Sequence, residues 1–195
     1  MRVFVVYCHP SENSFTHRVY ENFIEGLKAA GHEVISSDLY QMEFRTDISE
    51  EEYLRETFYR AGEPVAEDVR IEQEKIQNSD GIAFIYPVFW TEAPAKLVGW
   101  FDRVWTTGFA YSPDPQMKVL EKALVIACAG KSMKSLTETG EKDAMETVML
   151  GDRIRSRAKE KEMIILDNVT HWNEELAEHV IPEHLAKAYQ LGLGF

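Results

Sequence analysis

Short apolar runs rich in β-branched and aromatic residues alternate along this chain with longer segments of helical periodicity. Near-continuous apolar strands separated by helices are typical of a parallel sheet that is covered on both faces. We therefore expect an α/β fold with five parallel strands. The expected strands are Val3 to Tyr7, Glu33 to Ser37, Gly81 to Tyr86, Ala123 to Cys128 and Met163 to Leu166.

The segment between the first two runs has the spacing of a helix. Val19, Phe23 and Leu27 lie on one helical face, and Gly31 offers the left-handed residue that ends a helix. Five strands joined by such helices suit the flavodoxin-like order 2-1-3-4-5, in which ligands bind outside the carboxyl ends of the strands. We expect a single domain of this kind over residues 1–195.

Three further segments are expected to be helical. The acidic segment from Asp47 to Arg60 forms a helix of its own, and another helix follows the fourth strand around Asp143 to Asp152. The tail from Asn173 to Leu191 contains a helical turn and a closing helix, which restarts at Pro182 because proline interrupts a helix.

The charge balance excludes two classes of partner. The formal net charge of −12 repels both the nucleic-acid backbone and an anionic membrane surface, so any phosphate must be held by local donors. The apolar start of the chain is too short for a signal peptide, and no long apolar segment follows, so we expect a cytoplasmic protein without stable membrane insertion. Cys8 and Cys128 form no disulfide framework and are expected as small buried side chains.

The loop after the first strand, Tyr7 to His17, is polar and leads directly into a helix. Its hydroxyls and the open amides at the start of the helix can hold a phosphate, aided by the helix dipole. The loop contains no glycine and matches neither a P-loop nor a dinucleotide fingerprint, so an ordinary capped turn is an equal alternative. His9 either donates to a phosphate or satisfies a local carbonyl.

The loop after the third strand, Tyr86 to Pro94, contains three aromatic residues and two prolines. Phe89 and Trp90 can stack on a planar ring whose developing negative charge the loop amides stabilise, or they plug the core or a subunit contact. The segment Thr107 to Tyr111 forms either a second aromatic wall or ordinary packing.

No conventional catalytic motif competes with this interpretation. The histidines have no metal-ligand spacing, no nucleophile elbow is present, and neither cysteine lies in a nucleophile pattern, so we assign no metal and no catalytic protein residue. His179 and His184 lie in a charged tail and are expected at the surface. A bound cofactor would then carry the chemistry.

Together these segments resemble the NAD(P)H:quinone oxidoreductase family of flavodoxin-like flavoproteins, most closely over residues 1–130. The resemblance rests on His9-Pro10, Ser14-Phe15, Glu33 to Leu39, Tyr86-Pro87 to Trp90, Pro94-Ala95, Gly99 to Val104 and Phe109-Ala110-Tyr111.

The resemblance implies three groups of site residues. The flavin phosphate is expected at one loop, the flavin ring along two others, and the substrate beside a fourth segment that often lies at a dimer interface. These groups are His9, Ser14, Phe15 and Thr16; Pro87, Val88, Phe89 and Trp90 with Ala129 and Gly130; and Phe109 and Tyr111.

The chain departs from the family after the fourth strand. Of the family's Thr-Thr-Gly-Gly turn only Gly130 matches clearly, and the Tyr and His that assist charge relay in animal members are missing. Lys131 and Lys134 occupy this region and either meet the reduced flavin or a cofactor phosphate in the substrate pocket, or are solvated surface lysines.

The resemblance implies an enzyme that passes a hydride from NAD(P)H through flavin N5 to a quinone or similar acceptor by a ping-pong mechanism, as a homodimer. We expect FAD rather than FMN, because the pattern of His9, Ser14 and Phe15 resembles the FAD-binding branch. The alternatives are a nucleotide-sensing regulatory subunit of a membrane transport system, a flavodoxin-like electron carrier, and an azo- or nitro-group reductase.

Overall fold

A parallel sheet of five strands forms the centre of the fold, in a computed structural model that describes residues 1–111, 114–170 and 174–195. The strands lie in the order β2-β1-β3-β4-β5, and every pairing is parallel. The predicted fold class and strand order are therefore confirmed. The strands are β1 (Arg2–Tyr7), β2 (Glu33–Asp38), β3 (Gly81–Pro87), β4 (Leu120–Cys128) and β5 (Ala158–Leu166).

The strands β4 and β5 begin earlier than the apolar runs predicted. Their first residues are largely charged, and Lys159 of the edge strand β5 pairs with Glu121 of β4 at 2.7 Å. At the edge of a sheet, charged side chains reach solvent and discourage pairing with another chain. An apolar run therefore underestimates the length of such a strand.

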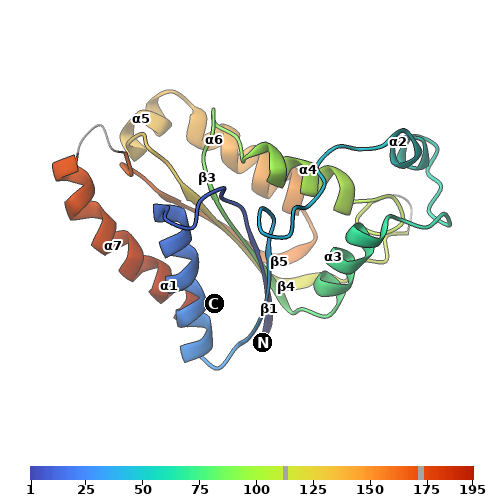
Figure 1. Cartoon of the computed structure of the whole chain (residues 1–195), viewed down its shortest axis with the longest axis horizontal. Helices are drawn as coiled ribbons and strands as arrows, with labels where there is room; N and C mark the ends of the chain where they lie inside the picture. Colours follow the sequence, from blue (N-terminus) through green and yellow to red (C-terminus); the bar gives the residue numbers. More distant parts are fainter. Residues whose placement is uncertain (112–113, 171–173) are drawn as a thin grey trace.

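Helices cover both faces of the sheet (Figure 1). Alternate residues of β1 divide between two cores, with Phe4 and Val6 in one and Val3 and Val5 in the other. Cys8 and Cys128 are free and buried as predicted, on opposite faces. The helices α1 (Phe15–Ala29) and α7 (Glu174–Leu193) cover one face, and α3 (Glu67–Gln77), α4 (Ala95–Val104), α5 (Met133–Glu138), α6 (Glu141–Glu146) and the π-helix η1 (Thr147–Ile154) cover the other.

The predicted acidic helix is confirmed as α2 (Glu50–Thr57), which lies at the outer end of the molecule (Figure 1). It begins with a capping box in which Ser49 and Glu52 each accept the other's backbone amide. Acidic residues fill its first turn, where they favour the helix dipole.

The helices α1 and α7 run side by side in backbone contact (Figure 1). A Cβ on Gly26 would lie 2.1 Å from the Tyr189 carbonyl oxygen, so only glycine allows this approach. The expectation that Pro182 restarts the last helix is wrong, because α7 continues through it and packing on α1 offsets the lost hydrogen bond. Asn173, where that tail was predicted to begin, lies outside the described residues. No helix in these ranges is both long and apolar enough to span a membrane.

The segment after β4 differs from the single helix predicted around Asp143 to Asp152. Ser132 caps α5, and Gly140, with φ of 75°, separates α5 from α6. The chain then changes to the π-helix at Thr147. The two short turns place Leu136 and Glu141 at the carboxyl edge of the sheet, where β3 and β4 end.

Candidate active site

Three loops meet around a cavity of about 500 Å³ at the carboxyl edge of the sheet. They follow β3, β4 and β5, as expected for a ligand site in an open parallel sheet. We call this space the edge cavity. It is lined by Val88, Trp90, Thr91, Ala129, Gly130, Lys131, Leu136, Glu141 and Thr170. The sequence predicted five of these residues, and the structure adds Thr91, Leu136, Glu141 and Thr170.

The loop after β3 forms a tight hairpin over the edge cavity. The amide of Phe89 donates to the Glu92 carbonyl at 2.8 Å and that of Glu92 to the Phe89 carbonyl at 3.0 Å. The two turn residues between them, Trp90 and Thr91, have φ of 51° and 66°. Such a turn normally carries Asn-Gly, and a β-branched residue at positive φ is strained. Backbone strain of this kind concentrates at functional sites.

Trp90 at the tip of this hairpin is 99% exposed. It lines the edge cavity on one side and, with Phe89, a second hollow of about 560 Å³ on the other. The alternative in which these aromatics plug the core is therefore excluded within one chain, while a subunit contact stays a prediction. Pro87, by contrast, is buried as the last residue of β3.

Most amides of this loop are already used within the fold. Val88 donates to the Cys128 carbonyl at 2.8 Å, and Phe89 to Glu92. Trp90 and Thr91 are left with amides that make no hydrogen bond among the described residues. The expectation that the amides of this loop face a planar ring therefore applies only to the amides of the two turn residues.

Two carboxylates hold the hairpin from opposite sides. Glu141 at the start of α6 accepts the Thr91 hydroxyl at 3.2 Å. Glu92 itself accepts the guanidinium of Arg153, from η1, at 2.9 Å. Both contacts are made by helices that follow β4, so the hairpin position depends on the π-helical segment as well as on β3.

The loop after β1 has the properties of an anion site. Ser14 caps α1 by accepting the His17 amide at 3.0 Å, while the first-turn amides of Phe15 and Thr16 have no acceptor within the helix. Burial lowers the pKa of His9, and its Nδ1 lies 2.9 Å from the Ser11 amide nitrogen and 3.0 Å from the Ser11 carbonyl oxygen, so the ring already has a local backbone partner. Its Nε2 makes no hydrogen bond among the described residues and is open to a ligand.

The other predicted phosphate residues lie around this helix start. The side chain of Thr16 is buried and hydrogen bonds to the Cys128 thiol, whose pKa burial raises to about 12. Below the loop, the buried Tyr7 hydroxyl and His17 Nδ1 have no hydrogen-bond partner among the described residues, and the two rings are 5.6 Å apart. Because buried polar atoms are normally hydrogen bonded, the interior beneath this loop is unusually polar.

The expectation that His184 lies at the surface is wrong. Its ring is half-buried beside Phe15, with centroids 6.1 Å apart, and its Nε2 lies 2.8 Å from the Asp167 carbonyl oxygen. Asp167 in turn accepts the Met133 amide at 2.7 Å, which ties the loop after β5 to α5. No motif marks these residues, because the contact between α1 and α7 brings them together.

Three predicted pocket residues are not brought to the edge cavity within one chain. Lys134 is 83% exposed and pairs with Glu138 on α5 at 3.8 Å. Phe109 packs against the core, and the Tyr111 hydroxyl donates to Glu56 at 2.6 Å near the end of α2. Lys134 thus lies on the solvated side of α5, away from the edge cavity, while a role of Phe109 and Tyr111 at the substrate stays a prediction that requires a second copy of the chain.

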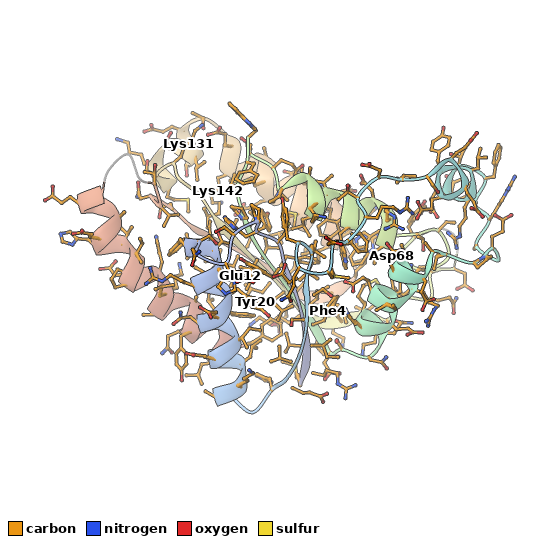
Figure 2. All side chains as sticks on the ribbon, viewed as in Figure 1. Phe4, Glu12, Tyr20, Asp68, Lys131 and Lys142 are labelled. Carbon is orange, nitrogen blue, oxygen red and sulfur yellow. The ribbon has the colours of Figure 1, made fainter. Side chains whose placement is uncertain are left out.

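A separate cavity of about 500 Å³, which we call the α2 cavity, lies between α2, α3 and α4. Its floor contains the fully buried Arg103, which donates to Glu52 at 2.7 Å and to Asp68 at 2.9 Å. Burial would raise the pKa of Glu52, but hydrogen bonds from Arg103 and the Ser49 amide hold it at about 2. Figure 2 shows Asp68 at the opposite end of the molecule from Lys131.

Gly130 lines the edge cavity without a conformational need for glycine. A Cβ added there would meet nothing closer than the Thr170 Cβ at 3.7 Å, which is ordinary contact. The space above Gly130 is therefore open, and the structure would also accommodate a Cβ at this position. The amides of Gly130 and Lys131 also make no hydrogen bond among the described residues, so both can meet a ligand.

Comparison with known proteins places the chain among flavodoxin-like proteins. A family model described as "Flavodoxin-like fold" matches residues 1–154. The chain is 37% identical over 125 residues to "NAD(P)H dehydrogenase [quinone] 1" of Rattus norvegicus, covering 57% of this chain and 45% of that protein. It is 31% identical to "Ribosyldihydronicotinamide dehydrogenase [quinone]" of Pongo abelii, covering 71% and 68%. The chain spans about half the length of the first curated relatives.

A solved structure is similar over nearly the whole chain. It is described as NAD(P)H:quinone oxidoreductase from Methanothermobacter marburgensis and has 42% sequence identity and a TM-score of 0.93. The similarity covers 99% of this chain and 96% of that one. The described loops therefore lie in a framework that the two chains share.

Proposed function

The chain belongs to the NAD(P)H:quinone oxidoreductase family of flavodoxin-like proteins, and we propose that it is a flavin-dependent enzyme that oxidises NAD(P)H and reduces a quinone or similar small acceptor. One observation carries this proposal. The edge cavity lies where an open parallel sheet binds ligands, beneath a strained hairpin whose tryptophan is fully exposed. An exposed indole beside a cavity is a stacking surface for a planar ring.

The residues present fit a flavin. The open amides of Phe15 and Thr16 and the open Nε2 of His9 suit its phosphate, supported by the dipole of α1. Val88, Trp90 and the turn at Gly130 form walls of the size and polarity that a flat ring requires. A bound flavin would supply the redox centre that accepts hydride from the nicotinamide and returns it to the acceptor.

The chain itself contributes orientation and electrostatics. Trp90 supplies stacking area that aligns a ring over the cavity. The amides of Trp90, Thr91, Gly130 and Lys131, which make no hydrogen bond within the described part of the chain, can donate to negative charge that develops in the cavity. We propose a ping-pong order in which the nicotinamide nucleotide and the acceptor occupy the edge cavity in turn, so that the nucleotide leaves before the acceptor enters.

We also propose a two-fold homodimer. Phe58 and Tyr59 at the end of α2 are more than half exposed, as is Trp90, and contiguous exposed aromatics are unusual in a monomer. Tyr111, tied to α2 through Glu56, would then reach the edge cavity of the second copy. Light scattering at several concentrations tests this, and a monomer at all of them would contradict it.

Anaerobic stopped-flow absorbance tests the enzyme proposal. The purified protein, loaded with FAD or FMN, should lose its flavin absorbance on mixing with NADH or NADPH and regain it on adding a quinone. No loss with either nucleotide would reject the proposal. In a separate stepwise titration with dithionite, reduction of the flavin in two resolved one-electron steps would instead favour an electron carrier. Mass spectrometry of the cofactor released from the native protein tests the preference for FAD.

A further inference from the structure

The edge cavity contains one pair of opposite charges. Among the described residues that line it, only Lys131 and Glu141 are charged. The Lys131 ammonium lies 2.6 Å from one carboxylate oxygen of Glu141 and 2.8 Å from the other. The remaining lining side chains are apolar or carry hydroxyls, so the cavity as a whole is neutral within a chain of net charge −12.

The carboxylate of this pair is fixed, while the ammonium has freedom to move. Glu141 also accepts the Thr91 hydroxyl at 3.2 Å and the Thr139 hydroxyl at 2.8 Å, and its side chain is 22% exposed. The Lys131 side chain has a four-carbon stem and is 57% exposed, and its ammonium hydrogen bonds only to Glu141 among the described residues. A change of ligand can therefore displace the lysine and leave the glutamate in place.

Glu141 stays ionised under ordinary conditions. The hydrogen bond from Lys131 is the largest cause that lowers its pKa, followed by that from Thr139. The carboxylate thus cancels the lysine charge throughout the neutral pH range. A ligand with its own negative charge must compete with Glu141 for the only cation in this lining, whereas an uncharged ligand need not.

We propose that Glu141 is a specificity-determining residue that, by neutralising Lys131, makes the edge cavity select uncharged planar acceptors over anionic ones. This inference rests on the proposed function, since it names the acceptor class of the same cavity. A charge at the wall of a cleft acts on a ligand within a few ångströms, well inside the screening length of about 8 Å at physiological salt.

The chain offers a matched control pair. Lys134 and Glu138 on α5 form the same kind of ion pair at 3.8 Å, only a few residues away. Both side chains are well exposed and neither lines the edge cavity. Substitutions there change the net charge by the same amount, so any difference between the two pairs is due to position and not to overall charge.

The test compares 1,4-naphthoquinone with 1,4-naphthoquinone-2-sulfonate as acceptors for the flavin-loaded protein. The measured quantity is the ratio of kcat/KM for the sulfonate to that for the uncharged quinone. Glu141→Gln, which keeps an acceptor for both threonines, should raise this ratio about tenfold. Lys131→Met should lower it by a similar factor, and the double variant should return it close to the original value.

The controls Lys134→Met and Glu138→Gln should leave the ratio within about twofold, and 0.5 M salt should reduce all differences. Equal shifts in both pairs, or an unchanged ratio in Glu141→Gln, would overturn the inference. Binding of naphthalene-2-sulfonate by calorimetry gives a readout without turnover. If no variant reduces either quinone but Glu141→Gln binds the sulfonate more tightly, the proposed enzyme fails while the charge selection stands.

Discussion

The edge cavity and the α2 cavity have nearly the same volume, yet they use their charges in opposite ways. In the α2 cavity, Arg103 is fully buried and donates to two carboxylates and the Arg45 carbonyl. In the edge cavity, Lys131 is more than half exposed with one partner. Saturated buried charges hold elements together, whereas an exposed, singly paired charge remains available to a ligand. Volume alone therefore does not identify the active site.

The largest expected difference between the two cavities is in stability. Arg103→Met leaves the Glu52 and Asp68 carboxylates without their buried cation and should lower the free energy of unfolding by about 3–5 kcal/mol. Lys131→Met, which removes a solvated pair, should cost less than about 1 kcal/mol. Urea denaturation followed by circular dichroism measures both. Equal losses would contradict the distinction.

Acid should weaken the α2 cavity first. The pKa of Glu52 is lowered from 4.5 to about 2 in the folded chain, so its stabilisation is present above the unfolded value and is lost as pH falls from about 4.5 towards 2. The expected loss in the free energy of unfolding is about 2 kcal/mol, a value that already includes a reduction for partial solvent access to Glu52. Denaturation midpoints at several pH values measure it. Glu52→Gln, which retains the cap, should flatten the dependence in this window.

Substitution of Trp90 tests whether the edge cavity is the site of the reaction. Trp90→Ala should lower kcat/KM for a quinone about tenfold, because the stacking surface is lost, which corresponds to about 1.4 kcal/mol. Since the side chain is 99% exposed, unfolding free energy should change by no more than about 0.5 kcal/mol. Steady-state kinetics and thermal melting measure the two effects. Loss of stability without loss of turnover would assign Trp90 to packing.

The smallest expected effect concerns the strained turn. Thr91→Gly should raise the unfolding free energy by up to about 1 kcal/mol, because glycine accepts the φ of 66° that threonine resists. Thr139 is the matched control, since its hydroxyl also donates to Glu141 but its φ is −90°. Thr139→Gly should therefore destabilise. Both changes are measured by thermal melting, and a destabilised Thr91→Gly would remove the argument for strain.

The sheet could be predicted because each strand contains at least a short apolar run and helical segments connect the strands. The five strands and the acidic helix α2 follow from patterns within a few residues, and the strand order follows from the fold that such an alternation suits. The charged starts of β4 and β5 and the continuous α7 do not, because pairing between the two strands and packing on α1 decide them.

For the same reason, only some residues of the candidate site could be predicted from the sequence. Val88, Trp90 and Gly130 lie in loops that directly follow strands, so topology places them. Glu141, Arg153 and His184 reach the site region from distant helices, and nothing in their local sequence indicates it. Residues that depend on tertiary packing need the structure to be found.

The contact between α1 and α7 has a consequence for biosynthesis. The apolar side of β1 formed by Val3 and Val5 is buried beneath these two helices, and α7 follows all five strands in the chain. A ribosome therefore releases the complete sheet before the last helix can close over one of its faces. During that interval the nascent chain presents uncovered aliphatic surface, which makes this step the natural point for chaperone binding or for aggregation.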